Sequence, residues 1–267
     1  MTEQGTARTE TLDLSLLSGL LEGEVAIVTG AAMGNGAAIA RGLAACGASV
    51  VLADMNPQAL AETVEAMKAE GAKVIGVEGN VADYADCEAL AAAAKEAFGD
   101  VSILINNAGI CRRVPAEEDG FLASIDAQLS VNAMGSAQMV KALLPQLKAR
   151  RGKVVNVGSI ASFVATTGGV GYGMSKGAAL LLTKTLAAEL APYGIRVNGI
   201  APGVIKTPMT EPTRANPDAV SKYFDHIPFR RFGDAEELIG PVVFLTSAQS
   251  SYVTGVMLAV DGGFTAV

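Results

Sequence analysis

Short runs of apolar, mostly β-branched residues recur along the chain, and alanine-rich stretches of helical character separate them. The runs lie at residues 24–30, 49–54, 73–80, 102–109, 153–159, 195–203 and 257–263. They are almost continuously apolar, as strands are when helices cover both faces of a parallel sheet. The pattern predicts a single α/β domain, a doubly wound sheet of about seven parallel strands with helices on both faces.

Length and composition exclude several classes of protein. The chain has 267 residues, which suits one large domain better than two. Half of the residues are hydrophobic, and the net charge is −7 without a basic cluster, so nucleic acid is not an expected partner. No run approaches the ~20 apolar residues of a membrane helix, so no membrane is expected either. Three cysteines without a C-x-x-C pattern, and a single histidine, indicate a reducing, cytoplasmic setting and no metal site.

A glycine-rich turn follows the first predicted strand and opens the first helix, in the stretch "VTGAAMGNGAAIA" (28–40). Gly30, Gly34 and Gly36 allow the backbone to bend and to approach a pyrophosphate closely. The N-terminus of the following helix supplies N–H groups and a partial positive charge. This strand–turn–helix context predicts a dinucleotide-binding site.

The second predicted strand ends at Asp54, 24 residues after Gly30. A carboxylate at this place accepts hydrogen bonds from the adenosine ribose hydroxyls and repels a 2′-phosphate. Its neighbours Ala53, Met55 and Met33 offer no positive charge. We therefore expect NAD to be preferred over NADP, although an aspartate that only caps the helix beginning at Pro57 is the alternative.

Further polar residues fall at strand ends or on helices that meet the same edge of the sheet. N-N-A-G (106–109) ends the fourth strand, Ser159 ends the fifth, and Asn132 lies in the helix between them. Tyr172 and Lys176 are four residues apart on an otherwise apolar helix expected at 170–194, so they share one helix face. Each residue alone is compatible with a cap or a turn, but together they indicate proton chemistry.

These residues resemble the motifs of the short-chain dehydrogenases/reductases over roughly residues 22–267. The motifs are T-G-A-A-M-G-N-G (29–36), N-N-A-G, Asn132, Ser159, Y-G-M-S-K (172–176), P-G-V-I-K-T (202–207) and V-D-G-G (260–263). The resemblance implies a Rossmann-type fold and a catalytic tetrad of Asn132, Ser159, Tyr172 and Lys176. One departure is Asn80-Val81, where many members have Asp-Val; an asparagine can still bond an adenine amino group through its carbonyl.

The motifs and this resemblance together assign the cofactor contacts. The expected residues are Gly30, Met33, Gly34, Asn35, Gly36, Asp54, Asn80, Val81, Asn107, Ala108, Gly109, Tyr172, Lys176, Pro202, Gly203, Val204, Ile205 and Thr207. Thr207 resembles the residue that bonds the nicotinamide carboxamide.

The Tyr172–Lys176 pair suggests an acid–base mechanism. A tyrosine has an unperturbed pKa near ~10. A neighbouring ammonium and the positive nicotinamide are expected to lower that pKa, so that Tyr172 takes the alcohol proton as hydride leaves carbon. Ser159 is expected to hold the reacting oxygen, Lys176 the nicotinamide ribose, and Asn132 a water that relays the proton. The predicted reaction is hydride transfer between NAD and a secondary alcohol or ketone.

The expected substrate residues are Cys111, Arg112 and Arg113, which follow N-N-A-G, together with Ser159. Paired arginines suit an anionic group, since a guanidinium binds a carboxylate bidentately. The I-x-R-R pattern and residues 238–247 resemble family members that act on sugar acids, so a sugar acid or polyol is the expected substrate. The arginines could instead pair with Glu117, Glu118 or Asp119 as surface charges.

Three other functions remain open at this point. They are reduction of a 3-oxoacyl thioester, oxidation of a simple secondary alcohol, and a non-catalytic NAD-binding sensor. NADP would suit the thioester reductase better, and Asp54 argues against it. A sensor is expected to have lost a member of the tetrad, and all four residues are present.

The sequence also predicts where the domain begins, where a lid lies and which helix forms an interface. Residues 1–22 are expected to form an N-terminal leader ahead of a dinucleotide-binding catalytic domain at 23–267. Residues 204–233 contain four prolines and follow a strand's carboxyl end, which suggests a substrate lid, with a surface excursion as the alternative. Excess apolar surface on residues 178–190 indicates an interface. The family resemblance implies a homotetramer.

Overall fold

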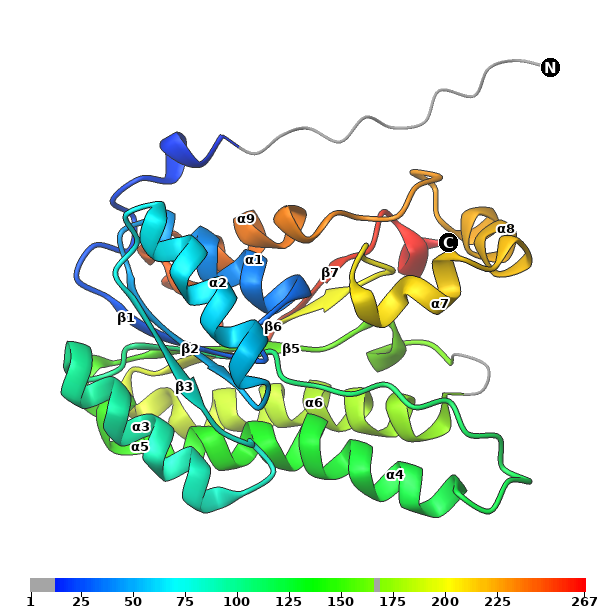
Figure 1. The fold of residues 1–267 in the computed structure, drawn as a ribbon, viewed down its shortest axis with the longest axis horizontal. Helices are drawn as coiled ribbons and strands as arrows, with labels where there is room; N and C mark the ends of the chain where they lie inside the picture. Colours follow the sequence, from blue (N-terminus) through cyan, green and yellow to red (C-terminus); the bar gives the residue numbers. More distant parts are fainter. Residues whose placement is uncertain (1–12, 166–168) are drawn as a thin grey trace.

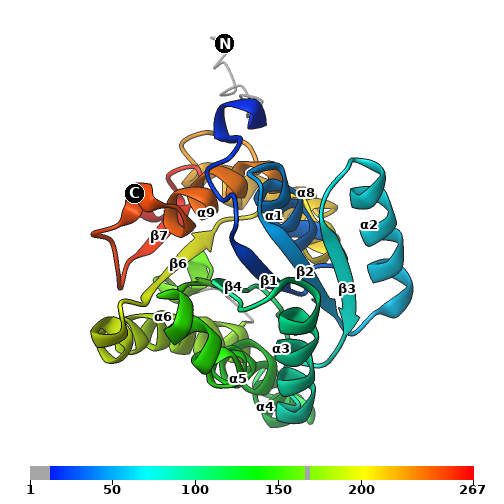
Figure 2. The same cartoon turned by 90° about the vertical axis from the view of Figure 1, so that its left-hand side faces the viewer.

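The sheet has seven parallel strands, in the order β3-β2-β1-β4-β5-β6-β7, and the strand order reverses between β1 and β4 (Figure 1 and Figure 2). The computed structural model describes residues 13–165 and 169–267. The strands are β1 (Val25–Thr29), β2 (Ser49–Asp54), β3 (Val74–Glu78), β4 (Ile103–Asn106), β5 (Lys153–Val157), β6 (Arg196–Pro202) and β7 (Met257–Val260). The predicted doubly wound sheet is confirmed.

Helices cover both faces of the sheet, as Figure 2 shows end-on. One layer contains α1 (Gly34–Ala45), α2 (Pro57–Ala69) and α9 (Ile239–Thr246). The opposite layer contains α3 (Tyr84–Phe98), α4 (Phe121–Leu129), α5 (Gly135–Arg150) and α6 (Val170–Leu190). In sheets of this type, ligands bind at the carboxyl ends of the strands, in the crevice where the strand order reverses.

Side chains of the central strands alternate between two cores. Ala26 and Val28 of β1 belong to the core beneath α1, α2 and α9, whereas Val25 and Ile27 belong to the core beneath α3, α5 and α6. All four are buried. Because successive side chains of a strand point to opposite faces, a strand covered on both faces must be apolar at every position. This requirement explains the continuous apolar runs of the sequence.

The helix that precedes β5 is interrupted where Asn132 lies. A π-helical turn, Ser130–Met134, joins α4 to α5, and the Gly135 N–H donates to the carbonyl of Ser130. Single π turns inside α-helices occur frequently at functional sites. The turn places Asn132 inside the protein, on the side that faces the loop after β4.

The N-terminal boundary of the domain lies earlier than the sequence suggests. Leu21 is 1% exposed, and its N–H donates to the carbonyl of Cys46. Leu14, Leu17 and Leu20 pack against the core beneath α1. The boundary predicted after residue 22 is therefore wrong, because these leucines bury apolar surface that the sequence could not assign to a partner. Residues 1–12 of the expected leader lie outside the described residues.

Two further boundaries differ from expectation. The strand predicted at 102–109 ends at Asn106, because the next residues turn toward β1. The helix predicted at 170–194 ends at Leu190, and a 3₁₀ turn (Ala191–Tyr193) containing Pro192 follows it. Both differences leave the order of the elements unchanged.

The excursion after β6 lies over the carboxyl edge of the sheet (Figure 1). It contains α7 (Glu211–Arg214) and α8 (Pro217–His226). Among the described residues, no helix is both long enough and apolar enough to cross a membrane. Within the same part of the chain, no three histidine, cysteine or acidic side chains are grouped as metal ligands.

Candidate active site

The glycine-rich turn between β1 and α1 adopts a backbone that requires glycine. Gly30 has a φ of +62° and Gly34 a φ of +57°, both in the left-handed region. A Cβ on Gly36 would lie 2.1 Å from the carbonyl oxygen of Gly30, which is closer than any side chain allows. The turn and the first residues of α1 therefore form a close-fitting backbone surface, as a pyrophosphate site requires.

Side chains from β1 and from the N-N-A-G motif hold this turn in place. The hydroxyl of Thr29 accepts hydrogen bonds from the N–H groups of Asn107 and Ala108, both at 3.0 Å. The Asn107 amide donates to the carbonyls of Thr29 and Gly30, both at 2.9 Å. Asn107 thus supports the glycine-rich turn, in addition to lining the cleft beside it.

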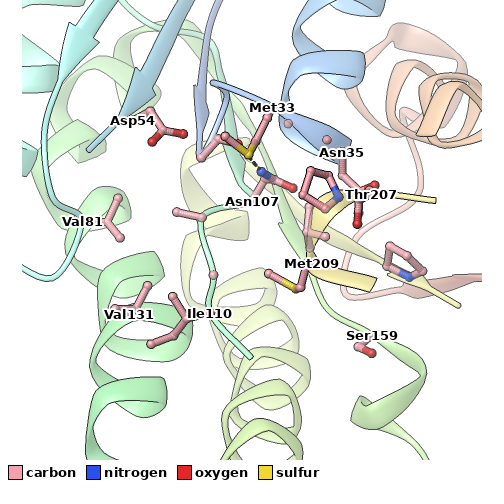
Figure 3. A pocket seen from close by; sticks show the side chains of 18 of the residues that line it. Met33, Asn35, Asp54, Val81, Asn107, Ile110, Val131, Ser159, Thr207 and Met209 are labelled. Atoms are coloured by element: carbon pink, nitrogen blue, oxygen red, sulfur yellow. Dashed lines mark hydrogen bonds between the residues drawn. The ribbon is translucent and has the colours of Figure 1, made fainter. Parts of the chain in front are cut away.

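A cleft of about 320 Å³ runs along the carboxyl edge of the sheet from Asp54 to Lys176. Figure 3 shows Asp54 and Val81 on one side of it and Thr207 on the other. Seventeen of the eighteen expected cofactor residues line this cleft, and Val204 lines the adjoining cavity instead. The structure therefore brings together residues from six separate segments of the sequence.

The cleft has features that fit a dinucleotide. At the Asp54 end, the carboxylate accepts hydrogen bonds from the Ala32 and Asn56 N–H groups, both at 3.0 Å, and is fixed at the rim. Among the described residues, the side-chain oxygen of Asn35 is buried and has no hydrogen-bond partner. A buried acceptor of this kind is expected to find its donor in a ligand.

A second cavity, of about 380 Å³, adjoins the first. Ser159, Tyr172, Gly203, Met209 and Thr210 line both. The wall of the second cavity comes from the loop after β4 and from the excursion after β6. A molecule in the second cavity therefore meets a molecule in the cleft at the Ser159 and Tyr172 hydroxyls.

Only some of the expected substrate residues line the second cavity. Cys111, Arg113 and Ser159 line the second cavity, whereas Arg112 lines neither space. Arg112 and Arg113 are both exposed, and neither makes an ion pair within residues 13–165 and 169–267. The suggested surface pairs with Glu117, Glu118 or Asp119 are not formed in that part of the chain. The expectation that both arginines face the substrate is wrong for Arg112.

Ser159 follows β5 and begins a short 3₁₀ turn (Ile160–Ser162). Its Oγ accepts a hydrogen bond from the Ala161 N–H at 3.1 Å, so the side chain is held in one orientation. The Ser162 hydroxyl accepts from the Ser159 N–H and donates to the Lys176 carbonyl at 2.8 Å. These bonds tie the serine to α6, the helix that carries Tyr172.

Lys176 is buried and Tyr172 is partly buried, and removal of these side chains from water dominates their pKa values. Lys176 is 5% exposed, and its Nζ donates to the Val157 carbonyl at 2.7 Å. Burial lowers the pKa of Lys176 to about 8. Burial also raises the pKa of Tyr172 to about 12, against the opposing hydrogen bond to Ser159 and the positive charge of Arg113.

The expected lowering of the tyrosine pKa includes the charge of a bound nicotinamide, and the groups of the protein alone do not produce it. The Lys176 nitrogen lies 5.7 Å from the centre of the Tyr172 ring and donates its bond elsewhere. Desolvation penalises the phenolate more than the protein's own charges stabilise it. In the protein alone, the phenol is therefore protonated at neutral pH.

Asn132 is 2% exposed, and its side-chain amide makes three hydrogen bonds. Its Oδ1 accepts from the Ile110 N–H at 2.8 Å, and its Nδ2 donates to the Ile110 carbonyl and to Ser175 Oγ, both at 2.9 Å. Both donors are used, so the expected role of holding a relay water does not fall to them. The structure gives this side chain a positioning contact with the loop after β4.

Two residues of this region were missed by the sequence reasoning. Tyr223, on α8, lines the second cavity, and its ring packs against Phe232 and Phe264. Gln128, on α4, bonds the backbone of Arg112. Gln128 precedes Asn132 by four residues, and this helical spacing was the available signal.

A cleft that is lined by a glycine-rich turn and opens beside a Tyr–Lys pair and a second cavity is typical of a nicotinamide-dependent oxidoreductase. A family model described as "Enoyl-(Acyl carrier protein) reductase" matches residues 30–265. The chain belongs to the short-chain dehydrogenase/reductase family, whose members bind a nicotinamide cofactor and act on alcohol or ketone groups.

Several characterised proteins are similar over almost their whole length. The chain is 39% identical to 2-(R)-hydroxypropyl-CoM dehydrogenase of Xanthobacter autotrophicus over 250 residues, which are 91% of this chain and 99% of the relative. It is 39% identical to gluconate 5-dehydrogenase of Gluconobacter oxydans over 246 residues, 92% and 96% of the two chains. A gluconate 5-dehydrogenase of Burkholderia cenocepacia, solved with NADP and tartrate, superposes with a TM-score of 0.88 at 34% identity, covering 94% of this chain and 99% of that chain.

Proposed function

We propose that the protein transfers a hydride between NAD and a secondary alcohol or ketone of a sugar acid, with a polyol as the neutral variant of this substrate. The observation that carries the proposal is the meeting of the two cavities at Ser159 and Tyr172, with Arg113 on the wall of the second. When bound, the cofactor accepts or returns the hydride. The protein supplies position, charge and a proton route.

The proposed roles follow from the contacts of each side chain. The Ser159 hydroxyl, fixed by the Ala161 N–H, holds the reacting oxygen beside the phenol of Tyr172. Tyr172 takes the alcohol proton during oxidation and returns it during reduction. Lys176, anchored to Val157, points its ammonium into the cleft, where it holds the nicotinamide ribose. Asn132 positions Ile110 on the cleft wall.

The proposed preference for an acid rests on Arg113. Its guanidinium reaches a cavity next to the reacting hydroxyls, and its charge acts on Tyr172. Within residues 13–165 and 169–267 this guanidinium forms no ion pair, and a guanidinium is suited to a carboxylate, which it binds through two parallel N–H donors. Two of the similar proteins are named for gluconate, a sugar acid.

Replacing Arg113 by alanine is expected to raise the KM for D-gluconate about tenfold or more, because a charge-assisted hydrogen bond contributes about 1.5–3 kcal/mol. The KM for sorbitol, a neutral polyol, is expected to stay close to its wild-type value. Arg112→Ala is the matched control, since Arg112 lines neither cavity. Steady-state NADH formation measures both constants. An equal effect of the two substitutions, or an equal effect on both substrates, would contradict the proposed carboxylate contact.

The same assay tests the function as a whole. Sugar acids, neutral polyols, simple secondary alcohols and 3-hydroxyacyl thioesters form the panel, each with NAD⁺ and NADP⁺. We expect sugar acids with NAD⁺ to give the highest kcat/KM. Highest activity on a thioester with NADP⁺ would replace the proposal by the 3-oxoacyl reductase alternative, and absence of turnover on the whole panel would favour a non-catalytic sensor.

The preference for NAD rests on Asp54, since the similar Burkholderia structure holds NADP and the family accepts both. The carboxylate is fixed at the adenosine end of the cleft and would lie near a 2′-phosphate of the same charge. Asp54→Asn is expected to raise kcat/KM for NADP⁺ relative to NAD⁺ by about tenfold. Asp83→Asn, which removes a carboxylate that caps α3, is the control. An unchanged cofactor ratio in Asp54→Asn would remove the basis of the NAD assignment.

Three further expectations are kept as proposals. We propose that residues 204–233 act as a lid, because their side chains cover the second cavity. We propose a homotetramer, because α6 exposes Val170, Met174 and Leu181, the last at 64%, which is apolar surface suited to a twofold contact. The three cysteines are free, which suits a reducing, cytoplasmic compartment.

A further inference from the structure

The backbone of Arg112 is bound at both of its polar groups by one buried side chain. The Arg112 N–H donates to Oε1 of Gln128 at 2.9 Å, and Nε2 of Gln128 donates to the Arg112 carbonyl at 3.2 Å. Gln128 lies on α4 and is 0% exposed. A side-chain amide that bonds an N–H and a C=O of one residue takes the place of a neighbouring strand.

One helical turn further along, Asn132 makes the same reciprocal contact with Ile110, at 2.8 and 2.9 Å. The two amides are four residues apart on one helix face, and their backbone partners are two residues apart. This register matches an extended segment, in which the side chains of residues i and i+2 lie on one side. Cys111 and Arg113 indeed line the second cavity together, whereas Arg112 does not.

The orientation of the Gln128 amide is fixed by its surroundings. Its two N–H donors are shared among the Arg112 carbonyl and the carbonyl and hydroxyl of Ser124, the last two at 3.1 and 3.2 Å, and the Ser124 carbonyl could not bond the amide oxygen if the two ends were exchanged. On the other side, a Cβ on Gly171 would lie 2.5 Å from Nε2. The helix that carries Tyr172 therefore packs directly on this amide, next to the catalytic residue.

We propose that Gln128 is a positioning residue for substrate recognition, which holds the Arg112 backbone so that Arg113 faces the second cavity. An apolar residue would fill the same space without satisfying the Arg112 N–H and C=O. The loop would then lose the pairing that sets which arginine faces inward. This inference rests on the proposed function, because its readout is recognition of an acid.

The test is Gln128→Met, which keeps an unbranched side chain of similar length and removes the amide. Gln146→Met is the matched control. Gln146 is also buried, and its amide likewise accepts from one backbone N–H, that of Val101, and donates to one carbonyl, that of Ala91, both at 2.9 Å. Neither cavity includes Gln146. We therefore expect both variants to lose stability, and only Gln128→Met to change the KM for an acid relative to that for a neutral polyol.

We expect Gln128→Met to raise the KM for D-gluconate about tenfold relative to that for sorbitol, as Arg113→Ala does, with kcat on sorbitol retained. The double variant Gln128→Met/Arg113→Ala is expected to have the KM of Arg113→Ala alone, because both changes remove one contact. Amide hydrogen exchange of a peptide containing Arg112 is expected to become faster in Gln128→Met and to stay unchanged in Gln146→Met.

Each other outcome overturns a defined part of the proposal. Additive effects in the double variant, or an equal rise of KM for both substrates, would reduce Gln128 to a stabilising residue. If Arg113→Ala removes the preference for acids but Gln128→Met keeps it, this inference is overturned and the proposed function is unaffected. A wild-type enzyme with no activity on acids would overturn both. Should Gln128→Met not fold, Gln128→Leu, which also removes the amide and is apolar, is expected to show the same selective rise in KM.

Discussion

Tyr172→Phe is expected to lower kcat by about 10³-fold while the protein still folds and binds NADH. General acid–base catalysis by a positioned side chain contributes about 10²–10⁴-fold, and the phenylalanine ring keeps the shape of the tyrosine without its proton. At neutral pH the phenol is protonated in both folded and unfolded protein, since its pKa is raised to about 12. The substitution therefore costs the fold only the hydrogen bond to Ser159, about 1 kcal/mol.

Three measurements check this result. They are kcat on the best substrate, NADH affinity by fluorescence titration, and the pH dependence of alcohol oxidation. Oxidation in the wild type is expected to speed up with rising pH, because it needs the phenolate, and this dependence is expected to disappear in Tyr172→Phe. Full turnover by the variant would remove Tyr172 from the mechanism. A loss of NADH binding equal to the loss of kcat would assign the residue to cofactor binding.

Lys176→Met is expected to abolish most of the activity and to make the fold more stable at pH 7. The pKa of Lys176 falls from 10.5 to about 8 on burial, so the charged ammonium is about 3 kcal/mol less favourable in the folded than in the unfolded protein. Methionine removes this cost and the bond to the Val157 carbonyl together. We expect a net gain in the free energy of unfolding of about 1–2 kcal/mol, because a bond from a charged donor contributes about 1.5–3 kcal/mol.

The pH dependence of stability separates this effect from general packing. Below pH 8 the lysine is charged in both states, and the whole cost of burial is present. Between pH 8 and 10.5 the unfolded chain binds the proton and the folded protein does not, so the stability of the wild type rises with pH. The advantage of Lys176→Met over the wild type is therefore expected to shrink across this interval.

Denaturant unfolding at several pH values measures this difference, with Lys184→Met as the control. Lys184 lies on the same helix and is exposed. A stability difference between Lys176→Met and the wild type that stays constant from pH 7 to above 10 would contradict the buried charge. For activity, a fall in kcat of about 10²-fold is expected, since the variant keeps Tyr172 but loses the ammonium proposed to hold the nicotinamide ribose in place.

The parts of the site that sequence reasoning predicted correctly are those governed by local rules. Gly30, Gly34 and Gly36 occupy a turn whose backbone excludes side chains, so their spacing already describes the shape. The position of Asp54 at the end of β2 also follows a local rule, because the strand ends where its apolar run ends. The roles assigned to Ser159, Tyr172 and Lys176 remain predictions, although the structure places all three at one cleft.

The failures share a different cause, which is that they depend on contacts between distant segments. Arg112 and Arg113 are adjacent and identical, yet only Arg113 lines the second cavity, and the backbone of Arg112 is bonded by Gln128, 16 residues away. Leu21 is in the core because it meets Cys46. The pKa of Tyr172 is raised because several elements exclude water from it, an effect that no spacing along the chain expresses.

The sequence by itself determined the alternation of strands and helices, the glycine-rich turn and the family, because backbone sterics and burial on both faces of a sheet act on neighbouring residues. The tertiary structure alone decided which arginine faces the second cavity, which leucines close the domain, and whether the tyrosine is a phenol or a phenolate in the protein alone. Those outcomes depend on distance, solvent exclusion and hydrogen-bond partners, which exist only after the chain has folded.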